Sequence, residues 1–76
     1  MKTIKIPEMG KVEEINLIDW KVNVGDRVTE GAEVAEVETM KSTFAVESPA
    51  TGTIKEIFAE PGEVVEVDQP LGSVET

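Results

Sequence analysis

The chain contains an internal duplication, and this feature limits its possible folds more than any other. Residues 17–39, LIDWKVNVGDRVTEGAEVAEVET, lie without a gap over residues 54–76, IKEIFAEPGEVVEVDQPLGSVET, after a shift of 37 positions. Five positions are identical, including Gly25 with Gly62 and the Val-Glu-Thr that ends each copy. Two copies are too few for a solenoid, which needs about three repeats to bury its faces. The duplication therefore predicts one closed body with approximate two-fold symmetry.

Both copies have the residue patterns of short β-strands. In copy one, apolar residues alternate with polar ones at the period of a half-buried strand, at Ile18, Trp20, Val22 and Val24. The segments VGDRV and PGEVV each place a glycine turn before the next apolar pair. The run EVAEVET alternates imperfectly, which predicts either a bulge or a strand buried on both faces. No segment has helical spacing over three turns. We therefore predict an all-β domain over residues 1–76, with about eight short strands in two packed sheets.

The composition argues against several classes of function. The chain has no cysteine and no histidine, which removes disulfides, Cys/His zinc sites and Ser–His or Cys–His nucleophiles. The formal net charge of −9 disfavours nucleic acid and anionic membranes as partners. That charge serves either solubility or the docking of a basic partner. No pattern indicates an acid–base pocket or a calcium loop. We expect a non-catalytic domain, and the lack of cysteine is typical of the cytoplasm.

The duplication also predicts where Lys41 lies. Copy one ends at Thr39 and copy two at Thr76, so the turn after Thr39 corresponds by symmetry to the end of the chain. Lys41 is then expected at one pole, on the opposite side from both termini. The turn sequence TMKS lacks Gly, Asn and Asp, so the turn itself is weakly encoded and depends on its flanking strands. A methionine at a hairpin tip does not improve solubility, and we interpret Met40 and Lys41 as functional.

Copy one carries about five extra residues within EMGKVEEIN. The symmetry places this segment at the same pole as Lys41. It is either a tolerated surface insertion, because loops accept length at little cost, or a recognition loop beside the lysine. The pattern alone leaves both interpretations open.

The segments VNVGDRV, GAEVAEVETMKS, VESPATGTI and EPGEVVEVDQPL, in this order, resemble the biotinyl/lipoyl attachment domain family over essentially the whole chain. The resemblance implies a flattened β-barrel, or barrel-sandwich hybrid, of two four-stranded sheets. It also implies that a ligase joins lipoic acid or biotin through an amide to a lysine at a hairpin tip. Lys41 matches that lysine.

The residues around Lys41 combine the two cofactor patterns. In the family, Glu38 is common to both, Thr39 looks lipoyl-like, Met40 looks biotin-like and Ser42 departs from both. Two glycines match positions that are associated with correct lipoylation, although a turn role alone also explains them. The ligase-recognition residues that the resemblance implies are Glu38, Thr39, Met40, Ser42, Gly25 and Gly52.

The rest of the chain favours the lipoyl type. The stretch KIPEMGKVEEINLIDWKVNVGD resembles the lipoyl-type opening, with its loop before a tryptophan and a Gly-Asp turn. In lipoyl domains this loop helps the partner dehydrogenase to recognise its own domain. The partner-recognition loop implied here consists of Met9, Gly10, Lys11, Val12, Glu13 and Glu14.

The resemblance thus implies a swinging-arm carrier for the acyl groups of a 2-oxo acid dehydrogenase-type complex. Its implied partners are a lipoate–protein ligase or lipoyl transferase and the three enzyme components of the complex. These are a thiamine diphosphate-dependent decarboxylase, an acyltransferase and dihydrolipoamide dehydrogenase. One alternative is a biotin carrier domain of a carboxylase or decarboxylase. The other is an unmodified barrel-sandwich module used only for assembly.

Overall fold

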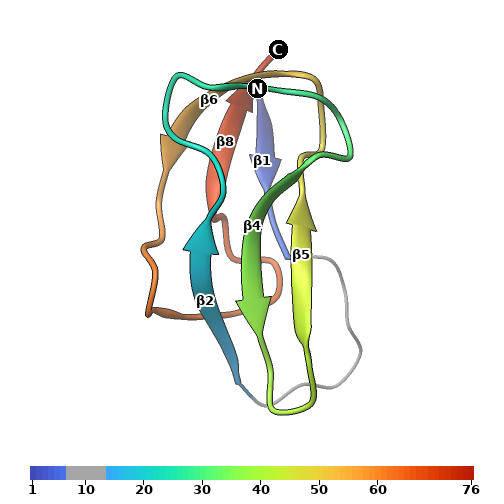
Figure 1. Ribbon diagram of the computed structural model, residues 1–76. Helices are drawn as coiled ribbons and strands as arrows, with labels where there is room; N and C mark the ends of the chain where they lie inside the picture. Colours follow the sequence, from blue (N-terminus) through green and yellow to red (C-terminus); the bar gives the residue numbers. More distant parts are fainter. Residues whose placement is uncertain (7–13) are drawn as a thin grey trace.

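The computed structural model describes residues 1–6 and 14–76, and in these ranges the regular structure is all β (Figure 1). The strands are β1 (Lys2–Ile4), β2 (Ile15–Trp20), β3 (Arg27–Val28), β4 (Glu33–Glu38), β5 (Thr43–Glu47), β6 (Gly52–Ile57), β7 (Val64–Val65) and β8 (Gly72–Glu75). They form two four-stranded antiparallel sheets, which confirms the predicted fold class. We call β5-β4-β2-β7 the hairpin sheet and β1-β8-β6-β3 the terminal sheet. No helix capable of crossing a membrane occurs in the described ranges.

The two sheets repeat each other, as the duplication predicted. A shift of 37 residues carries β2 onto β6 and β3 onto β7, and it carries β4 onto the whole of β8 and the two residues before it. Both copies have a register shift at the same place, between Leu17 and Asp19 in β2 and between Ile54 and Glu56 in β6. The order of strands is also the same, with β1 taking in the terminal sheet the edge place that β5 takes in the hairpin sheet. The symmetry is therefore a property of backbone pairing as well as of sequence.

One pair of symmetry-related turns has the same backbone geometry in both copies although the residue types differ. Gly31 has φ +88°, and its counterpart Asp68 has φ +73°. The left-handed region favours glycine, and aspartate is one of the few other residues that adopt it readily. The turn conformation of copy one is thus kept in copy two with a non-glycine residue.

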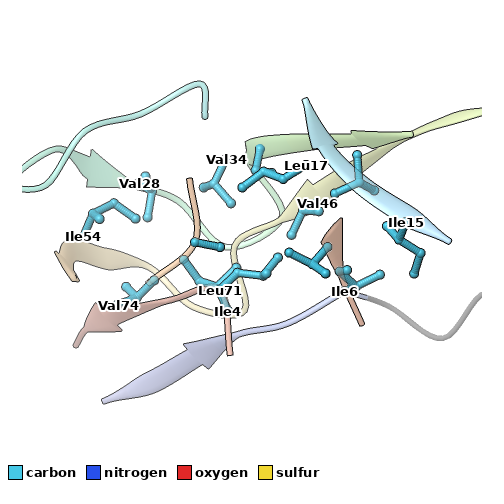
Figure 2. Close-up of a cluster of buried hydrophobic side chains, with 14 residues drawn as sticks. Ile4, Ile6, Ile15, Leu17, Val28, Val34, Val46, Ile54, Leu71 and Val74 are labelled. Atoms are coloured by element: carbon cyan, nitrogen blue, oxygen red, sulfur yellow. The ribbon is translucent and has the colours of Figure 1, made fainter. Parts of the chain in front are cut away.

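The core lies between the two sheets and takes side chains from both copies (Figure 2). Leu17 and Ile54, which are symmetry mates, are each 1% exposed. The buried cluster consists of Ile4, Ile6, Ile15, Leu17, Val28, Val34, Ala35, Val37, Val46, Ile54, Ala59, Val65, Leu71 and Val74. The extents of the molecule are 32 × 21 × 17 Å, so the sandwich is longer in one direction than in the other two.

The predicted inward face of the first long strand was wrong in part. Ile18 and Val24 are exposed, whereas Ile15 and Leu17 are buried. The register shift after Leu17 inserts a residue, so the inward positions change from odd to even numbers and Trp20 and Val22 then pack against the core. Of the two alternatives predicted for EVAEVET, the structure shows the bulge, because β4 shifts register against β5 between Glu33 and Ala35.

Gly52 is the first residue of β6, and at this position β6 and β8 lie too close together for a side chain. A Cβ atom there would overlap the backbone carbonyl oxygen of Glu75 in β8. We expect Gly52→Ala to lower the free energy of unfolding by about 1–3 kcal/mol, the usual cost of overpacking. Urea denaturation measures the loss. Glu56→Ala, an exposed position of the same strand, is the control and should change stability by less than about 0.5 kcal/mol. Equal stability of the two variants would contradict this packing.

Candidate functional site

Lys41 lies at the tip of the hairpin that joins β4 to β5. The turn runs from Thr39 to Ser42, and both termini lie at the other end of the molecule (Figure 1). Lys41 is exposed, and its neighbour Met40 is 83% exposed. The pole predicted from the duplication is therefore the pole observed. Glu38 and Thr43 pair across the base of the turn, so two packed strands support the tip.

The Thr39 side chain organises this turn. The backbone N–H of Thr39 donates to the Ser42 carbonyl oxygen at 2.8 Å. The N–H groups of Lys41 and Ser42 both donate to Thr39 Oγ1, each at 3.3 Å, and the hydroxyl donates to the Ser42 carbonyl oxygen at 3.2 Å. The expectation that TMKS has little turn chemistry was wrong, because a threonine hydroxyl can take the place of a backbone acceptor in a turn.

A groove runs beside the tip on the hairpin sheet. It has a volume of about 320 Å³ and is lined by Glu14, Asn16, Glu38, Thr39 and Met40. Asn16 of β2 pairs in register with Glu38 of β4, and the Asn16 side-chain amide donates to the Glu14 carboxylate at 3.2 Å. Sequence patterns did not identify Asn16, because only the pairing of β2 with β4 brings it to the hairpin.

The groove is negatively charged. Within residues 1–6 and 14–76, the ion pairs join Lys21 to Glu36 at 3.4 Å and Lys55 to Glu75 at 3.8 Å, and neither involves a groove carboxylate. The strands of the hairpin sheet contain no basic residue and carry Asp19, Glu33, Glu36, Glu38 and Glu47. Beside Lys41, the charged residues of the described groove lining are Glu14 and Glu38, which complement a basic group on a partner rather than an acidic one.

The structure unites some of the predicted site residues and separates others. Glu38, Thr39, Met40 and Ser42 surround Lys41, and Glu14 joins them through the groove. Gly52 packs against β8 near the chain end, at the pole away from Lys41. Gly25 donates its N–H to the carbonyl oxygen of Ile54, also away from the hairpin.

Gly25 and Gly52 both have local structural roles. The φ of +96° at Gly25 is in the left-handed region that favours glycine, and the close approach of β8 excludes a side chain at Gly52. The remaining residues of the predicted recognition loop lie outside the described residues, and these are Met9, Gly10, Lys11, Val12 and Glu13.

Among the described residues, the site offers one accessible primary amine, on a hairpin whose two strands pack in the core. In the ranges described, no three acidic side chains are grouped so that they could hold a metal ion. The Lys41 amine makes no ion pair with a described residue. Such an arrangement can accept a covalent group and hold it in solvent, whereas any further chemistry must come from that group or from another protein.

Comparison with known proteins agrees with this geometry. Residues 2–74 match the biotin/lipoyl family, which is described as "Biotin-requiring enzyme". The chain is 41% identical, over 69 residues, to the lipoamide acyltransferase component of a branched-chain alpha-keto acid dehydrogenase complex from Pseudomonas aeruginosa. It is 35% identical, over 75 residues, to the dihydrolipoyllysine-residue succinyltransferase component of a 2-oxoglutarate dehydrogenase complex from Staphylococcus saprophyticus.

These matches cover 90% and 97% of the chain but only 16% and 18% of the relatives, so the chain spans about a sixth of their length. The fold is similar to the solution structure of the lipoyl domain of the 2-oxoglutarate dehydrogenase complex from Azotobacter vinelandii. The TM-score is 0.77 at 25% identity, covering 97% of this chain and 95% of that one. The match over residues 2–74 and these similarities show that the chain belongs to the biotinyl/lipoyl attachment domain family, and that its relatives are of the lipoyl type.

Proposed function

We propose that this domain is a lipoyl carrier whose attachment site is Lys41, and that it serves a 2-oxo acid dehydrogenase-type complex. The observation that carries the proposal is the position of Lys41, exposed at the tip of a hairpin and at the far pole from both termini. The matching relatives are lipoamide acyltransferase and dihydrolipoyllysine-residue succinyltransferase components. Residues 1–76 act in this proposal as a single domain, and a cytoplasmic location stays a prediction.

The residues present fit a lipoyl group. The Lys41 ε-amine is in solvent and can form an amide with the carboxyl group of lipoic acid, and no described side chain blocks it with an ion pair. The bound group supplies the redox and acyl-transfer chemistry. The protein supplies position, because the hairpin rises from two strands whose inner faces are in the core. In this proposal the domain acts as a carrier, and the catalytic groups belong to the bound lipoyl group and to the partner enzymes.

The partners in this proposal are those that attach the group and those that use it. A lipoate–protein ligase or lipoyl transferase acts on the apo domain. A thiamine diphosphate-dependent decarboxylase, an acyltransferase and dihydrolipoamide dehydrogenase act on the modified domain. The hairpin residues Glu38, Met40 and Ser42, together with Glu14 in the acidic groove, lie where each of these enzymes must approach Lys41. Tethering the domain in one complex would raise its local concentration at each active site.

Met40 favours a second candidate, a biotin carrier domain. It precedes the lysine, where the biotin pattern has methionine, and its side chain is 83% exposed and accessible to a ligase. The relatives named above are acyltransferase components of 2-oxo acid dehydrogenase complexes, which gives the lipoyl function the greater support.

A competition between the two ligases tests the assignment. The apo domain is incubated with a lipoate–protein ligase and lipoic acid, and separately with a biotin–protein ligase and biotin, both with ATP. We expect intact-mass spectrometry to show one lipoyl group per chain in the first reaction and no biotin in the second. A biotin adduct without a lipoyl adduct would assign the domain to the biotin carriers. No adduct in either reaction would leave the assembly module as the function.

A further inference from the structure

The backbone of the Lys41 turn is held by a side chain. The backbone N–H of Ser42 faces Thr39 across the turn. In an ordinary two-residue hairpin, this N–H donates to the backbone carbonyl oxygen of the opposite residue. Here Ser42 N–H donates to Thr39 Oγ1 instead, and Lys41 N–H donates to the same oxygen. With its own proton directed to the Ser42 carbonyl oxygen, the hydroxyl uses its donor and both of its acceptor sites.

This arrangement fixes the peptide units on both sides of Lys41. The N–H of Lys41 belongs to the peptide that precedes its Cα, and the N–H of Ser42 belongs to the peptide that follows it. Because one oxygen accepts from both, the Lys41 Cα–Cβ direction is tied to the position of Thr39. Thr39 is in turn half-buried and follows β4 directly, so its own position is set by the packed hairpin sheet.

We propose that Thr39 is a positioning residue for the modification of Lys41, acting through the turn and not by direct contact with the modifying enzyme. The inference rests on the proposed function, because it concerns the reaction of the same amine. A ligase must place the amine against an activated carboxyl group, and holding reactants in the right geometry accelerates such a step. A turn already in the productive conformation loses less conformational entropy when the ligase binds it. Without the hydroxyl, both N–H groups turn to water and the tip samples other conformations.

Thr39→Val and Thr39→Ser form a matched pair for the test. Valine keeps the shape and removes the hydroxyl, and serine keeps the hydroxyl. We measure kcat and KM for lipoylation of the apo domain by a lipoate–protein ligase, with amide hydrogen exchange at Lys41 and Ser42 by NMR. Thr39→Val should lower kcat/KM roughly tenfold, the effect of losing about one net hydrogen bond, and should speed exchange at both amides. Thr39→Ser should restore both quantities to within about twofold of the original protein.

The outcomes separate this inference from the function on which it rests. If the original protein is not lipoylated, the proposed function fails and the role of Thr39 fails with it. If the original protein is lipoylated and Thr39→Val reacts equally fast, only the positioning role is wrong. If Thr39→Ser is as slow as Thr39→Val, the hydroxyl is not the active feature and the inference is again wrong. The urea midpoints of Thr39→Val and Thr39→Ser show whether each variant is folded under the assay conditions. Thr39→Ala is a second variant without the hydroxyl and is measured in the same way.

Discussion

Lys41→Ala should abolish covalent modification of the domain and leave its fold intact. The amine is the acceptor in the proposed reaction, so no adduct can form at this position without it. Its loss should change stability by less than about 0.5 kcal/mol, because the side chain is exposed and makes no ion pair with a described residue. Intact-mass spectrometry after incubation with lipoate–protein ligase measures the first effect, and urea denaturation the second.

Three controls make the result specific to this amine. Lys21→Ala and Lys55→Ala each remove a surface lysine that has a weak ion pair, and both variants should be lipoylated like the original protein. Lys41→Arg keeps the positive charge without a primary amine and should be as inert as Lys41→Ala. A lipoyl adduct on Lys41→Ala would show that another lysine is the attachment site. A loss of stability above about 1 kcal/mol would show that Lys41 packs against the body.

The sequence predicted the architecture well because the duplication is visible in both the residues and the pairing. It placed Lys41 at the pole opposite the termini, since copy one ends at Thr39 and copy two ends with the chain. This prediction compares only where the two copies end in the sequence, so it requires no knowledge of contacts between distant strands. The residue patterns predicted about eight strands in two sheets. The family resemblance added the division into two four-stranded sheets, which is confirmed, and the role of the hairpin.

The features that the sequence did not predict depend on pairing between strands. The inward face of β2 changes after Leu17 because its pairing with β4 shifts register there, and no local period reveals that shift. The close approach of Glu75 to Gly52 was also not predicted, because Glu75 is far along the chain. The place of Asn16 in the groove was not predicted for the same reason, because it depends on the register with Glu38. The association of Gly52 with lipoylation stays a prediction.

The hydrogen bonds of the turn at Thr39 were also not predicted, although the residues that form them are close together in the sequence. Glycine, asparagine and aspartate are the usual turn residues, but serine and threonine hydroxyls also bond to backbone groups two or three positions later. Thr39 lies two residues before Lys41 and three before Ser42, at the distances that its hydrogen bonds require. A search for side-chain acceptors at these offsets would have found it. The turn of the Lys41 hairpin is thus encoded locally, and the groove beside it is encoded by long-range pairing.

Trp20→Ala should have the largest effect on stability among the substitutions considered. The indole packs against the core from the end of β2, and its Nε1–H donates to the Ala59 carbonyl oxygen at 2.8 Å. Its ring edge also lies against Gly72, since a Cβ added there would be 3.3 Å from Cη2. The indole thus lies against the terminal sheet as well as its own, and its symmetry mate is the smaller Ile57.

Removing the indole leaves a cavity and an unpaired carbonyl. Large aromatic-to-alanine changes cost about 3–5 kcal/mol, and the lower end applies because Trp20 is half-buried. A domain of this size has a total stability of roughly 4–11 kcal/mol, so Trp20→Ala should remove a large share of it. Urea denaturation followed by circular dichroism measures the loss, because the substitution removes the only tryptophan and its fluorescence.

Two further variants separate the contributions of the Trp20 side chain to stability and provide an exposed control. Trp20→Phe keeps an aromatic ring and loses the hydrogen bond to Ala59, so it should cost about 1–3 kcal/mol. Val24→Ala removes an apolar side chain that the alternation placed on the same face but that is 59% exposed, and it should cost less than about 0.5 kcal/mol. If Trp20→Ala cost no more than Val24→Ala, the indole would not join the two sheets. Because the register shift after Leu17 turns Trp20 toward the core, that result would also contradict the pairing of β2 with β4.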